Sequence, residues 1–349
     1  MGSEMETRIF DLSREWEAGM EAGAAAIREG RLCVFPTETV YGIGADAMAP
    51  EAVGEIFRAK GRPQDNPLIV HIYDMEQAEQ IAREISPMAR RLMEAYWPGP
   101  FTAVVPCRGS VPREVTAGLD TVGIRMPSHP GARELLRRSG RLIAAPSANL
   151  SGRPSPTRVS HVVDDFLGRV PVILDGGDCS VGVESTVVDL TGDVPLVLRP
   201  GGVTPEMIQA QAGRVAVSPA VLDGLQEGEQ AASPGMKYKH YAPRAKVVVG
   251  DGESRKAIAI KLNSMYDRYI RQGRKTVILC SEESLPLYGE RQARSIGRTE
   301  EEIASRIFSA LRQADKDGLD VVLFEAVSKT GMGLAVMNRM IRAAGFDVI

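Results

Sequence analysis

Residues 31–47 read RLCVFPTETVYGIGADA, and this stretch decides how the first part of the chain is interpreted. The apolar run LCVF predicts a buried β-strand. It is followed by Thr37, Glu38, Thr39 and Tyr41, whose side chains all form hydrogen bonds. In α/β folds, ligands bind at the ends of strands. The stretch is therefore a candidate binding segment, with a turn rich in hydroxyl side chains as the alternative.

The same stretch contains Gly42, Gly44 and Ala47 in the GxGxxA spacing of a dinucleotide-binding turn. In such a site the turn opens directly into a helix, whereas here the helix is expected to begin several residues later, at Pro50. The spacing alone is therefore poor support for a NAD site.

The composition describes an ordinary globular chain of two domains. Its 349 residues exceed the usual size of one domain, and 44% hydrophobic with 25% charged residues is a typical balance. The net charge of −3 argues against a basic nucleic-acid-binding surface.

Four scattered cysteines without a CxxC pair disfavour a zinc ribbon or a redox dithiol, and three of them are expected to be buried. No apolar run suggests a signal or membrane segment, so we expect a cytoplasmic protein without membrane contact.

Between residues 30 and 200, many short β-type runs alternate with fewer amphipathic helical patterns. The helical patterns cover 14–30, 50–60, 86–96 and 128–140, and some β-type runs are too close together for a helical crossover. We therefore predict an α/β fold with one large mixed sheet. The predicted strands are RLCVF, LIVHI, TAVVP, TVGIRM, RLIAA, VPVILD, ESTVVDL and PLVLR.

The second part of the chain has a different organisation. A closing helix and a short strand over 203–217 precede a segment rich in Gly, Glu, Gln and Ala, which is the linker candidate. Further on, strands and helices alternate with about 20 residues between strands, as in a small parallel, doubly wound domain. We divide the chain into a domain at 1–217, a linker at 218–244 and a smaller Rossmann-like domain at 245–349.

The loop after the helix 50–60 carries cationic and amide side chains. Lys60 and Arg62 stand at the helix end, where the helix dipole alone would favour positive charge, and a loop stiffened by two prolines holds Asn66. Lysine as a point charge and arginine as a planar fork suit an oxyanion or phosphate clamp. His71, in the next predicted strand, is either a core histidine or a ligand contact.

The strand TVGIR at 121–125 places Thr121, Gly123 and Arg125 on one face. An arginine between apolar neighbours is costly to bury unless its charge is matched. We therefore expect Arg125 either to recognise a carboxylate or phosphate or to form a buried internal ion pair.

A second hydroxyl-rich loop lies in IAAPSANLSGRPSPT, residues 143–157. Its polar side chains, including Ser147 and Asn149, stand in a loop stiffened by prolines, which suits phosphate or ribose. No nearby histidine with a carboxylate would activate a serine, and neither GxSxG nor GxxxxGK[ST] occurs. Further along the chain, Ser185 and Arg199 stand near predicted strand ends.

Taken together, the motifs resemble those of the threonylcarbamoyl-AMP synthases, the family with a YrdC domain, in its long form with an extra C-terminal domain. The similarity covers nearly the whole chain and is densest over 30–245. The motifs are PTETVYG, KGRPQDNPLIVH, WPGP, TVGIRMPSHP, APSANLSGRPSPT, GVESTVVDL, LRPGG and SPGMKYKHYAP, with GMGLAVMNRM near the C-terminus.

The resemblance implies an adenylyltransferase that converts L-threonine, bicarbonate and ATP into threonylcarbamoyl-AMP and pyrophosphate. The product would serve N6-threonylcarbamoyladenosine modification of tRNAs that read codons beginning with A, through a separate transferase, with direct tRNA binding left open. The implied fold is a large twisted mixed sheet with an open, positively charged cleft, joined to a Rossmann-like domain. Mg²⁺ is expected with ATP, and we assign no metal ligand among the side chains.

The resemblance also implies the site residues. Lys60 and Arg62 would neutralise the triphosphate in catalysis. The expected ATP contacts are Arg62, Asn66, Thr121, Ser147, Asn149, Ser155, Arg199 and Tyr238. The expected threonine contacts are Thr39, His71, Arg125, Ala145 and Ser185. Arg125 would face the threonine carboxylate.

The segment SPGMKYKHYAP, 233–243, has a binding-site composition within the linker. By the resemblance it would fold over the cleft as a lid that excludes water, with Tyr238 as the nucleotide contact and Tyr241 next. Two alternatives stay open for the whole chain. Carbamoyl-adenylate chemistry of the hydrogenase-maturation type would need zinc-finger and acylphosphatase segments that this sequence lacks. RNA binding is opposed by the net charge and by the absence of interleaved aromatic and basic residues.

Overall fold

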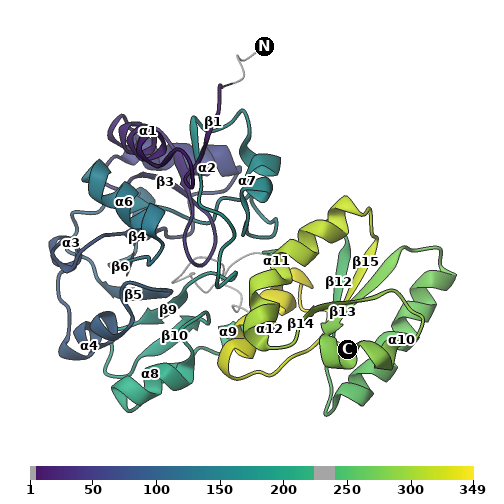
Figure 1. Ribbon diagram of the computed structural model, residues 1–349. Coiled ribbons are helices and arrows are strands. Elements are labelled where there is room, and N and C mark those ends of the chain that lie inside the picture. The colour runs from purple at the N-terminus through teal and green to yellow at the C-terminus, as the bar shows by residue number, and fades with distance from the viewer. Residues whose placement is uncertain (1–4, 224–239) are drawn as a thin grey trace. The chain divides into compact units, whose positions relative to one another are not determined.

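The computed structural model describes residues 5–223 and 240–349 (Figure 1). The chain divides into two compact units. The first contains the described residues of Met1–Ser151 and Ser155–Lys237, and the second contains Gly152–Pro154 with the described residues of Tyr238–Ile349. Each unit is built around its own β-sheet.

Short strands with helices between them form the first unit. Its elements are β1 (Arg8–Asp11), α1 (Trp16–Arg28), β2 (Cys33–Phe35), β3 (Gly42–Asp46), α2 (Pro50–Lys60), β4 (Ile69–His71), α3 (Met75–Ile81), α4 (Pro87–Tyr96), β5 (Phe101–Pro106), α5 (Arg113–Thr116), β6 (Thr121–Arg125), α6 (Pro130–Ser139), β7 (Ile143–Ala144), α7 (Val159–Phe166), β8 (Val172–Asp175), β9 (Thr186–Asp189), β10 (Leu196–Arg199), α8 (Pro205–Ala212), β11 (Ala216–Val217) and α9 (Ala220–Asp223). Every strand and helix predicted between residues 30 and 200 is present, and so is the helix followed by a strand over 203–217.

The strands form one mixed sheet in the order β1-β8-β2-β3-β7-β4-β6-β5-β9-β10-β11. Neighbours such as β4 and β6 run parallel, whereas β5 and β6 run antiparallel. The mixture follows from short connections. Only residues 36–41 separate β2 from β3, which permits an antiparallel pair but not a helical crossover. The predicted α/β fold with a large mixed sheet is confirmed.

The glycine-rich part of residues 31–47 is a strand and not a turn. β3 pairs antiparallel with β2, with Gly44 opposite Cys33 and Gly42 opposite Phe35. A Cβ atom on Gly44 would lie 2.6 Å from Ile143 Cγ2 and 2.8 Å from the Phe35 ring. Gly44 is therefore required by the close packing of neighbouring strands. This is why the dinucleotide-like spacing has no cofactor meaning here.

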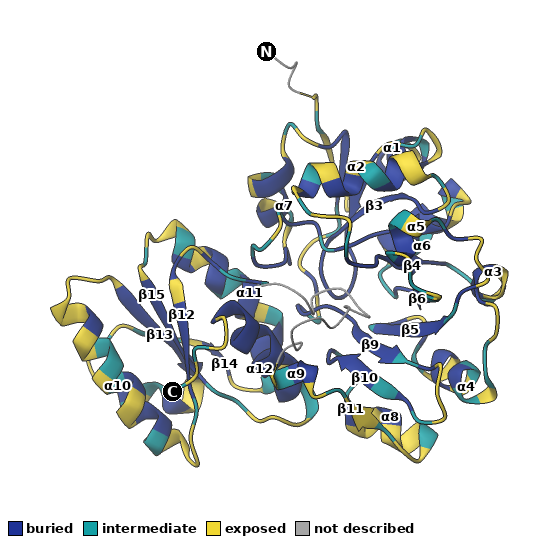
Figure 2. Ribbon diagram, turned by 180° about the vertical axis from the view of Figure 1, so that it is seen from behind, coloured by how far each residue is buried: buried dark blue, intermediate teal, exposed yellow. Residues whose placement is uncertain are grey.

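The two faces of the large sheet carry different cores. Cys33 and Phe35 of β2 pack with side chains of α1 and α6, whereas Val34 between them belongs to a larger core with α2, α3, α4 and α7. This alternation is the period of two expected of a strand. Figure 2 shows the outcome, with buried strands and with helices that expose their outer faces.

The second unit has a smaller sheet. Its elements are β12 (Lys246–Gly250), α10 (Arg255–Arg271), β13 (Thr276–Ser281), the 3₁₀ helix η1 (Glu282–Tyr288), β14 (Ala293–Gly297), α11 (Glu300–Lys316), β15 (Val321–Glu325) and α12 (Gly331–Ala343). The strand order is β12-β15-β13-β14, and every pair is parallel. The predicted doubly wound domain is confirmed, with β14 and η1 added in a stretch for which no element was predicted.

No helix in the described parts of either unit is long and apolar enough to cross a membrane.

All four cysteines are buried free thiols, which confirms the burial expected for three of them. Burial raises the pKa of the Cys280 thiol to about 12, so it stays protonated and unreactive near neutral pH. In the first unit, burial also raises the pKa values of Cys33 and Cys179.

A substitution at Gly201 tests how tightly the ends of the strands are packed. A Cβ atom there would lie 2.5 Å from both the Glu184 carbonyl oxygen and the Thr186 amide nitrogen, which are backbone atoms. We expect Gly201→Ala to lower the free energy of unfolding by about 1–3 kcal/mol, as overpacking does. Urea unfolding followed by circular dichroism measures it. Gly192→Ala is the matched control, because nothing lies within 4 Å of a Cβ there. Equal losses in both variants would contradict the packing argument.

Candidate active site

Three neighbouring strands bring predicted threonine contacts into one row. His71 at the end of β4 lies opposite Arg125 at the end of β6, and Arg125 lies opposite Thr102 of β5. Ala145 donates its backbone N–H to the carbonyl of Ile69 in β4 at 3.0 Å. These residues are far apart in the sequence and meet because β4 and β5 lie on either side of β6.

The row lies on the face of the sheet opposite the large core. Val122 and Ile124 belong to that core, so Thr121, Gly123 and Arg125 share the other face, as the alternation predicts. That other face carries a smaller apolar cluster. Polar side chains can therefore stand there without breaking the main core.

Arg125 forms a buried ion pair with Glu38. Its Nη2 donates to Glu38 Oε1 at 2.5 Å and its Nη1 donates to Thr39 Oγ1 at 2.9 Å, while the Ser128 amide donates to the second Glu38 oxygen at 3.1 Å. Burial raises the pKa of the Glu38 carboxyl, but the charge and hydrogen bond of Arg125 outweigh it, so this pKa lies below its ordinary value. The internal ion pair, one of the two alternatives for Arg125, is therefore present.

The ion pair leaves part of the Arg125 guanidinium for a ligand. Its Nε donates to the Gly99 carbonyl at 3.4 Å, so three of the five N–H groups have acceptors. The other two have no acceptor among the residues that the structure describes. A substrate carboxylate can share Arg125 with Glu38 through these two groups.

His71 is uncharged at neutral pH. Its Nδ1 lies 3.2 Å from the carbonyl oxygen of Ile69, so this nitrogen carries the proton and donates it. Burial lowers the pKa of the imidazole to about 3, and the positive charge of Arg125 contributes. A neutral imidazole with this pKa supplies no positive charge to a phosphate and is a poor proton acceptor near neutral pH.

A second group of hydrogen bonds surrounds the residues just before β9. Ser185 shares a hydrogen bond of 2.8 Å with Thr102 and accepts one of 3.2 Å from Arg199 Nη2. Arg199 Nε also donates to the Ser185 carbonyl at 3.1 Å. The Ser155 hydroxyl donates to the Glu184 carboxylate. The predicted ATP contact Arg199 therefore meets the predicted threonine contact Ser185, and the predicted ATP contact Ser155 binds the residue before it, Glu184.

Lys60 organises the loop at 147–149. Its Nζ donates to the carbonyl oxygens of Ser147 and Asn149 at 2.5 and 2.6 Å, and the Ser147 hydroxyl donates to Asn149 Oδ1 at 2.5 Å. The Lys60 side chain is buried. It both fixes the backbone of this loop and places a positive charge beside it.

Two predicted ATP contacts, Thr121 and Asn66, stand apart from the row. Thr121 begins β6 and Arg125 ends it, so the two lie about 13 Å apart along the strand. Asn66 comes shortly before β4, which is parallel to β6, and so lies at the Thr121 end. Its Oδ1 is buried without a hydrogen-bond partner among the described residues, which is typical of a group that binds a ligand or water. Arg62 is half-buried, with its guanidinium carbon 6.0 Å from the centre of the Phe57 ring.

The structure adds Thr102 and Glu184 to the residues selected from the sequence, and it identifies Glu38 of the candidate binding segment as the partner of Arg125. Glu38 stood in the hydroxyl-rich segment, but its partner Arg125 is 87 residues away in the chain. Thr102 is a polar residue in the apolar run FTAVVP, and this signal could have marked it. Glu184 precedes Ser185 directly and could have been selected with it.

The predicted linker begins with the short helix α9. Tyr238 lies outside the described residues, so its contact with ATP stays a prediction. Tyr241 is buried in the second unit, where its ring centre lies 5.4 Å from that of Phe308 and 5.6 Å from the guanidinium carbon of Arg339.

Comparisons with known proteins identify the family. The sequence profile of the family described as Telomere recombination matches residues 25–201, and the profile described as Threonylcarbamoyl-AMP synthase, C-terminal domain, matches residues 203–345. The threonylcarbamoyl-AMP synthase of Pyrococcus abyssi is 48% identical over 335 residues, which cover 96% of each chain. The chain belongs to the threonylcarbamoyl-AMP synthase family.

Further similarities agree with this membership. The threonylcarbamoyl-AMP synthase of Bacillus subtilis is 45% identical over 93% of each chain. The crystal structure of P. abyssi Sua5 complexed with L-threonine has a TM-score of 0.90 at 46% identity, covering 99% of this chain and 98% of that one. The resemblance inferred from the motifs is confirmed, including the long form and the synthase activity. Neither the hydrogenase-maturation chemistry nor RNA binding is favoured.

His71 makes the stability of the first unit depend on pH. An unfolded histidine has a pKa near 6.5, above the folded value of about 3, so between these values the unfolded state binds more protons. Stability is therefore fully present above about pH 6.5 and falls as the pH decreases through this window, by up to about 1.4 kcal/mol per pH unit.

We expect His71→Asn to flatten the dependence of the unfolding free energy on pH in this window, whatever its effect at neutral pH. Urea unfolding at a series of pH values measures the slope. Glu38, whose folded pKa is also lowered, adds a loss only as the pH falls below the ordinary range of a carboxyl. An unchanged slope above that range would show that His71 does not have the depressed pKa.

Proposed function

We propose that this chain condenses L-threonine, bicarbonate and ATP into threonylcarbamoyl-AMP and pyrophosphate. The observation that carries the proposal is the buried row of His71, Arg125 and Thr102, joined to Thr39 and Ser185. It stands in a chain that is similar over almost its full length to P. abyssi Sua5, whose structure was obtained with L-threonine.

The reaction has two bond-forming steps. The amine of threonine attacks the carbon of bicarbonate and water leaves, which gives a carbamate. An oxygen of the carbamate then attacks the α-phosphorus of ATP, the bond to the bridging oxygen breaks, and pyrophosphate leaves. Both partners of the second step are anions, so the protein mainly has to hold like charges together in line.

In this proposal threonine lies on the row. Its carboxylate accepts from the two N–H groups of Arg125 that have no acceptor among the described residues. The hydroxyls of Thr39 and Ser185 and the neutral imidazole of His71 offer hydrogen bonds to its hydroxyl and amino groups. Glu38 holds the guanidinium in position before the substrate arrives.

In this proposal ATP lies against two polar loops, the loop after α2 and the loop at 147–149. Lys60 supplies positive charge beside the loop that it orders, and Arg62 and Arg199 add charge from the loop after α2 and from the end of β10. The buried Oδ1 of Asn66 offers an acceptor to an N–H or O–H group of the nucleotide. These side chains position the triphosphate and stabilise the charge that moves to pyrophosphate.

Mg²⁺ fits this site as a partner of the phosphates. No group of three or more His, Cys, Asp or Glu side chains among the described residues could hold a metal ion. In many ATP sites Mg²⁺ is bound mainly by phosphate oxygens and water. Here it would neutralise charge on the triphosphate, with Lys60 and Arg62 beside it.

The chemistry of the product indicates which kind of protein must use it next. Threonylcarbamoyl-AMP is a mixed anhydride that water can hydrolyse, so we infer that a separate tRNA threonylcarbamoyl transferase takes it up in the cytoplasm. The linker segment 233–243 would act as the lid that keeps water away from it. Most of that segment lies outside the described residues.

Purified protein with ATP, L-threonine and bicarbonate should release pyrophosphate, and omission of threonine should stop the release. A coupled pyrophosphatase assay measures the rate, and mass spectrometry identifies threonylcarbamoyl-AMP. Pyrophosphate release that is indifferent to threonine would contradict the proposed substrate.

Arg125→Lys should raise the KM for threonine by about tenfold or more, because the lysine loses charged hydrogen bonds worth about 1.5–3 kcal/mol. The KM for ATP should change by less than about twofold, because none of the proposed ATP contacts forms a hydrogen bond with Arg125. The control is Arg141→Lys, which changes a half-exposed arginine that pairs with Asp46. Thermal unfolding checks that each variant folds. Equal rises in both KM values would show that the carboxylate does not bind Arg125.

A further inference from the structure

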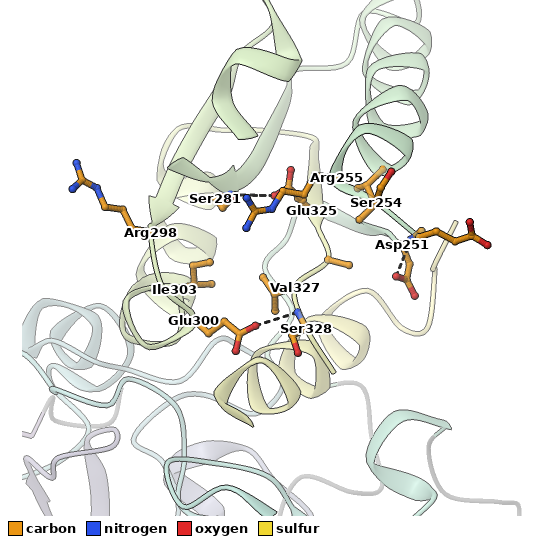
Figure 3. A pocket seen from close by; sticks show the side chains of 14 residues that line it. Asp251, Ser254, Arg255, Ser281, Arg298, Glu300, Ile303, Glu325, Val327 and Ser328 are labelled. Atoms are coloured by element: carbon orange, nitrogen blue, oxygen red, sulfur yellow. Dashed lines mark hydrogen bonds between the residues drawn. The ribbon is translucent and has the colours of Figure 1, made fainter. Parts of the chain in front are cut away.

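A cavity of about 430 Å³ lies in the second unit, at the carboxyl edge of its parallel sheet (Figure 3). Its lining includes Ser281 and Glu325, the last residues of β13 and β15, and residues of the segments that follow β12, β14 and β15. None of the lining residues belongs to the proposed threonine or ATP site. The reaction therefore leaves this cavity unexplained.

The cavity lies where the connections of the sheet diverge. From β13 the chain continues to β14, which lies at one edge of the sheet. From β15 the chain continues in the opposite direction, through α12 to Val348, which pairs with Val249 of β12 at the other edge. β13 and β15 are neighbours. The crevice between their carboxyl ends is therefore the topological switch point, where open α/β sheets bind their ligands.

The basic residues of the cavity already have acidic partners. Arg255 pairs with Glu283, and Arg298 donates its Nε and Nη2 to the two oxygens of Glu282 at 2.6 and 2.9 Å. Figure 3 shows the Arg298 guanidinium directed away from the other lining side chains. Their charge is thus largely neutralised before any ligand enters.

Three of the four acidic residues of the lining lack such a partner. Asp251 pairs with Lys329 at 2.6 Å. Glu253, Glu300 and Glu325 form no ion pair with any residue in the described parts of the chain. The cavity therefore keeps an excess of negative charge.

Glu325 is the acidic group buried most deeply in the lining, with 3% of its surface exposed. Its Oε1 accepts from the Ser281 hydroxyl at 3.0 Å and from the Ser281 backbone N–H at 3.4 Å, and its Oε2 accepts from the Tyr288 hydroxyl at 2.5 Å. All three donors are neutral. A carboxylate has about four acceptor sites, so Oε2 retains capacity for a ligand. Because a buried charge is costly without a counter-charge, a cation in the cavity would be stabilised there.

Some backbone N–H groups at the helix ends beside the cavity already have acceptors. The side chains of Ser254 and Thr299 already accept backbone N–H groups in the first turns of α10 and α11. Glu300 accepts the amides of Ser328 and Gly333 at the start of α12, at 3.2 and 2.9 Å. These N–H groups therefore do not bind a phosphate, and the carboxylate of Glu300 takes two of them.

We propose that this cavity binds a small organic amine, a ligand with a primary ammonium group on a short hydrocarbon chain. The ammonium donates to Glu325 at the bottom of the crevice, and the hydrocarbon contacts Ile258 and Ile303, which are buried apolar residues of the lining. The site is separate from the proposed synthesis of threonylcarbamoyl-AMP, and its test uses neither ATP nor threonine.

The test is isothermal titration calorimetry of the full chain with putrescine at low ionic strength. We expect one saturable site. Glu325→Gln should weaken binding by about tenfold or more, because a charged hydrogen bond is replaced by a neutral one. Glutamine keeps an acceptor for Ser281 and a donor for Tyr288, so the fold should be retained. Glu253→Gln, the same charge change at an exposed lining residue, should weaken binding by less than about threefold.

A second variant blocks the cavity without changing its charge. Ala326 lines the cavity and is partly buried, so Ala326→Leu should fill space and abolish putrescine binding. Thermal unfolding confirms that each variant folds. Absence of putrescine binding to the unmodified chain, or equal affinity in the Glu325→Gln variant, would overturn the proposal. Binding of inorganic phosphate that Ala326→Leu abolishes would overturn the assignment to amines.

Discussion

The candidate active site depends on the buried ion pair between Glu38 and Arg125. A charge in this position would be costly alone, and removing one partner of such a pair costs about 3–5 kcal/mol. The pair ties the segment after β2 to the end of β6. The same segment accepts the amides of Val181 and Gly182 through the carbonyls of Glu38 and Thr39, at 2.8 and 3.1 Å. One short stretch thereby positions both Arg125 and the residues that precede β9.

The other cations of the first unit follow the same principle. Lys60 is held by two loop carbonyls, and Arg199 is held by the carbonyl and hydroxyl of Ser185. Each positive group is fixed by a neutral or acidic acceptor before a substrate arrives. A reaction between two anions benefits from such preorganisation, because the protein does not have to reorient its charges during the reaction. The neutral His71 completes the row without adding to the charge.

The second unit places polar groups at the carboxyl ends of parallel strands, but with the opposite charge. Its cavity presents Glu325 with neutral hydroxyl donors, and its arginines are paired with glutamates. The first unit suits anionic substrates and the second suits a cation. This contrast gives the C-terminal domain a chemistry of its own, which fold similarity alone does not provide.

The sequence alone predicts the alternation of strands and helices and the division into a mixed and a parallel sheet, and it contains the motifs that indicate the family. These features are local, since a strand can be predicted from its composition and from its period of two. It also placed Thr121, Gly123 and Arg125 on one face, because a strand allows no other arrangement.

The folded chain shows what the sequence does not: Arg125 pairs with Glu38, GIGAD is a strand, and Lys60 holds a loop 87 residues away. It also placed Thr121 at the far end of β6 from Arg125 and formed the cavity around Glu325. Such contacts depend on strand order and register. Many strand orders are compatible with one pattern of strands and helices, and the packing of the whole sheet selects among them.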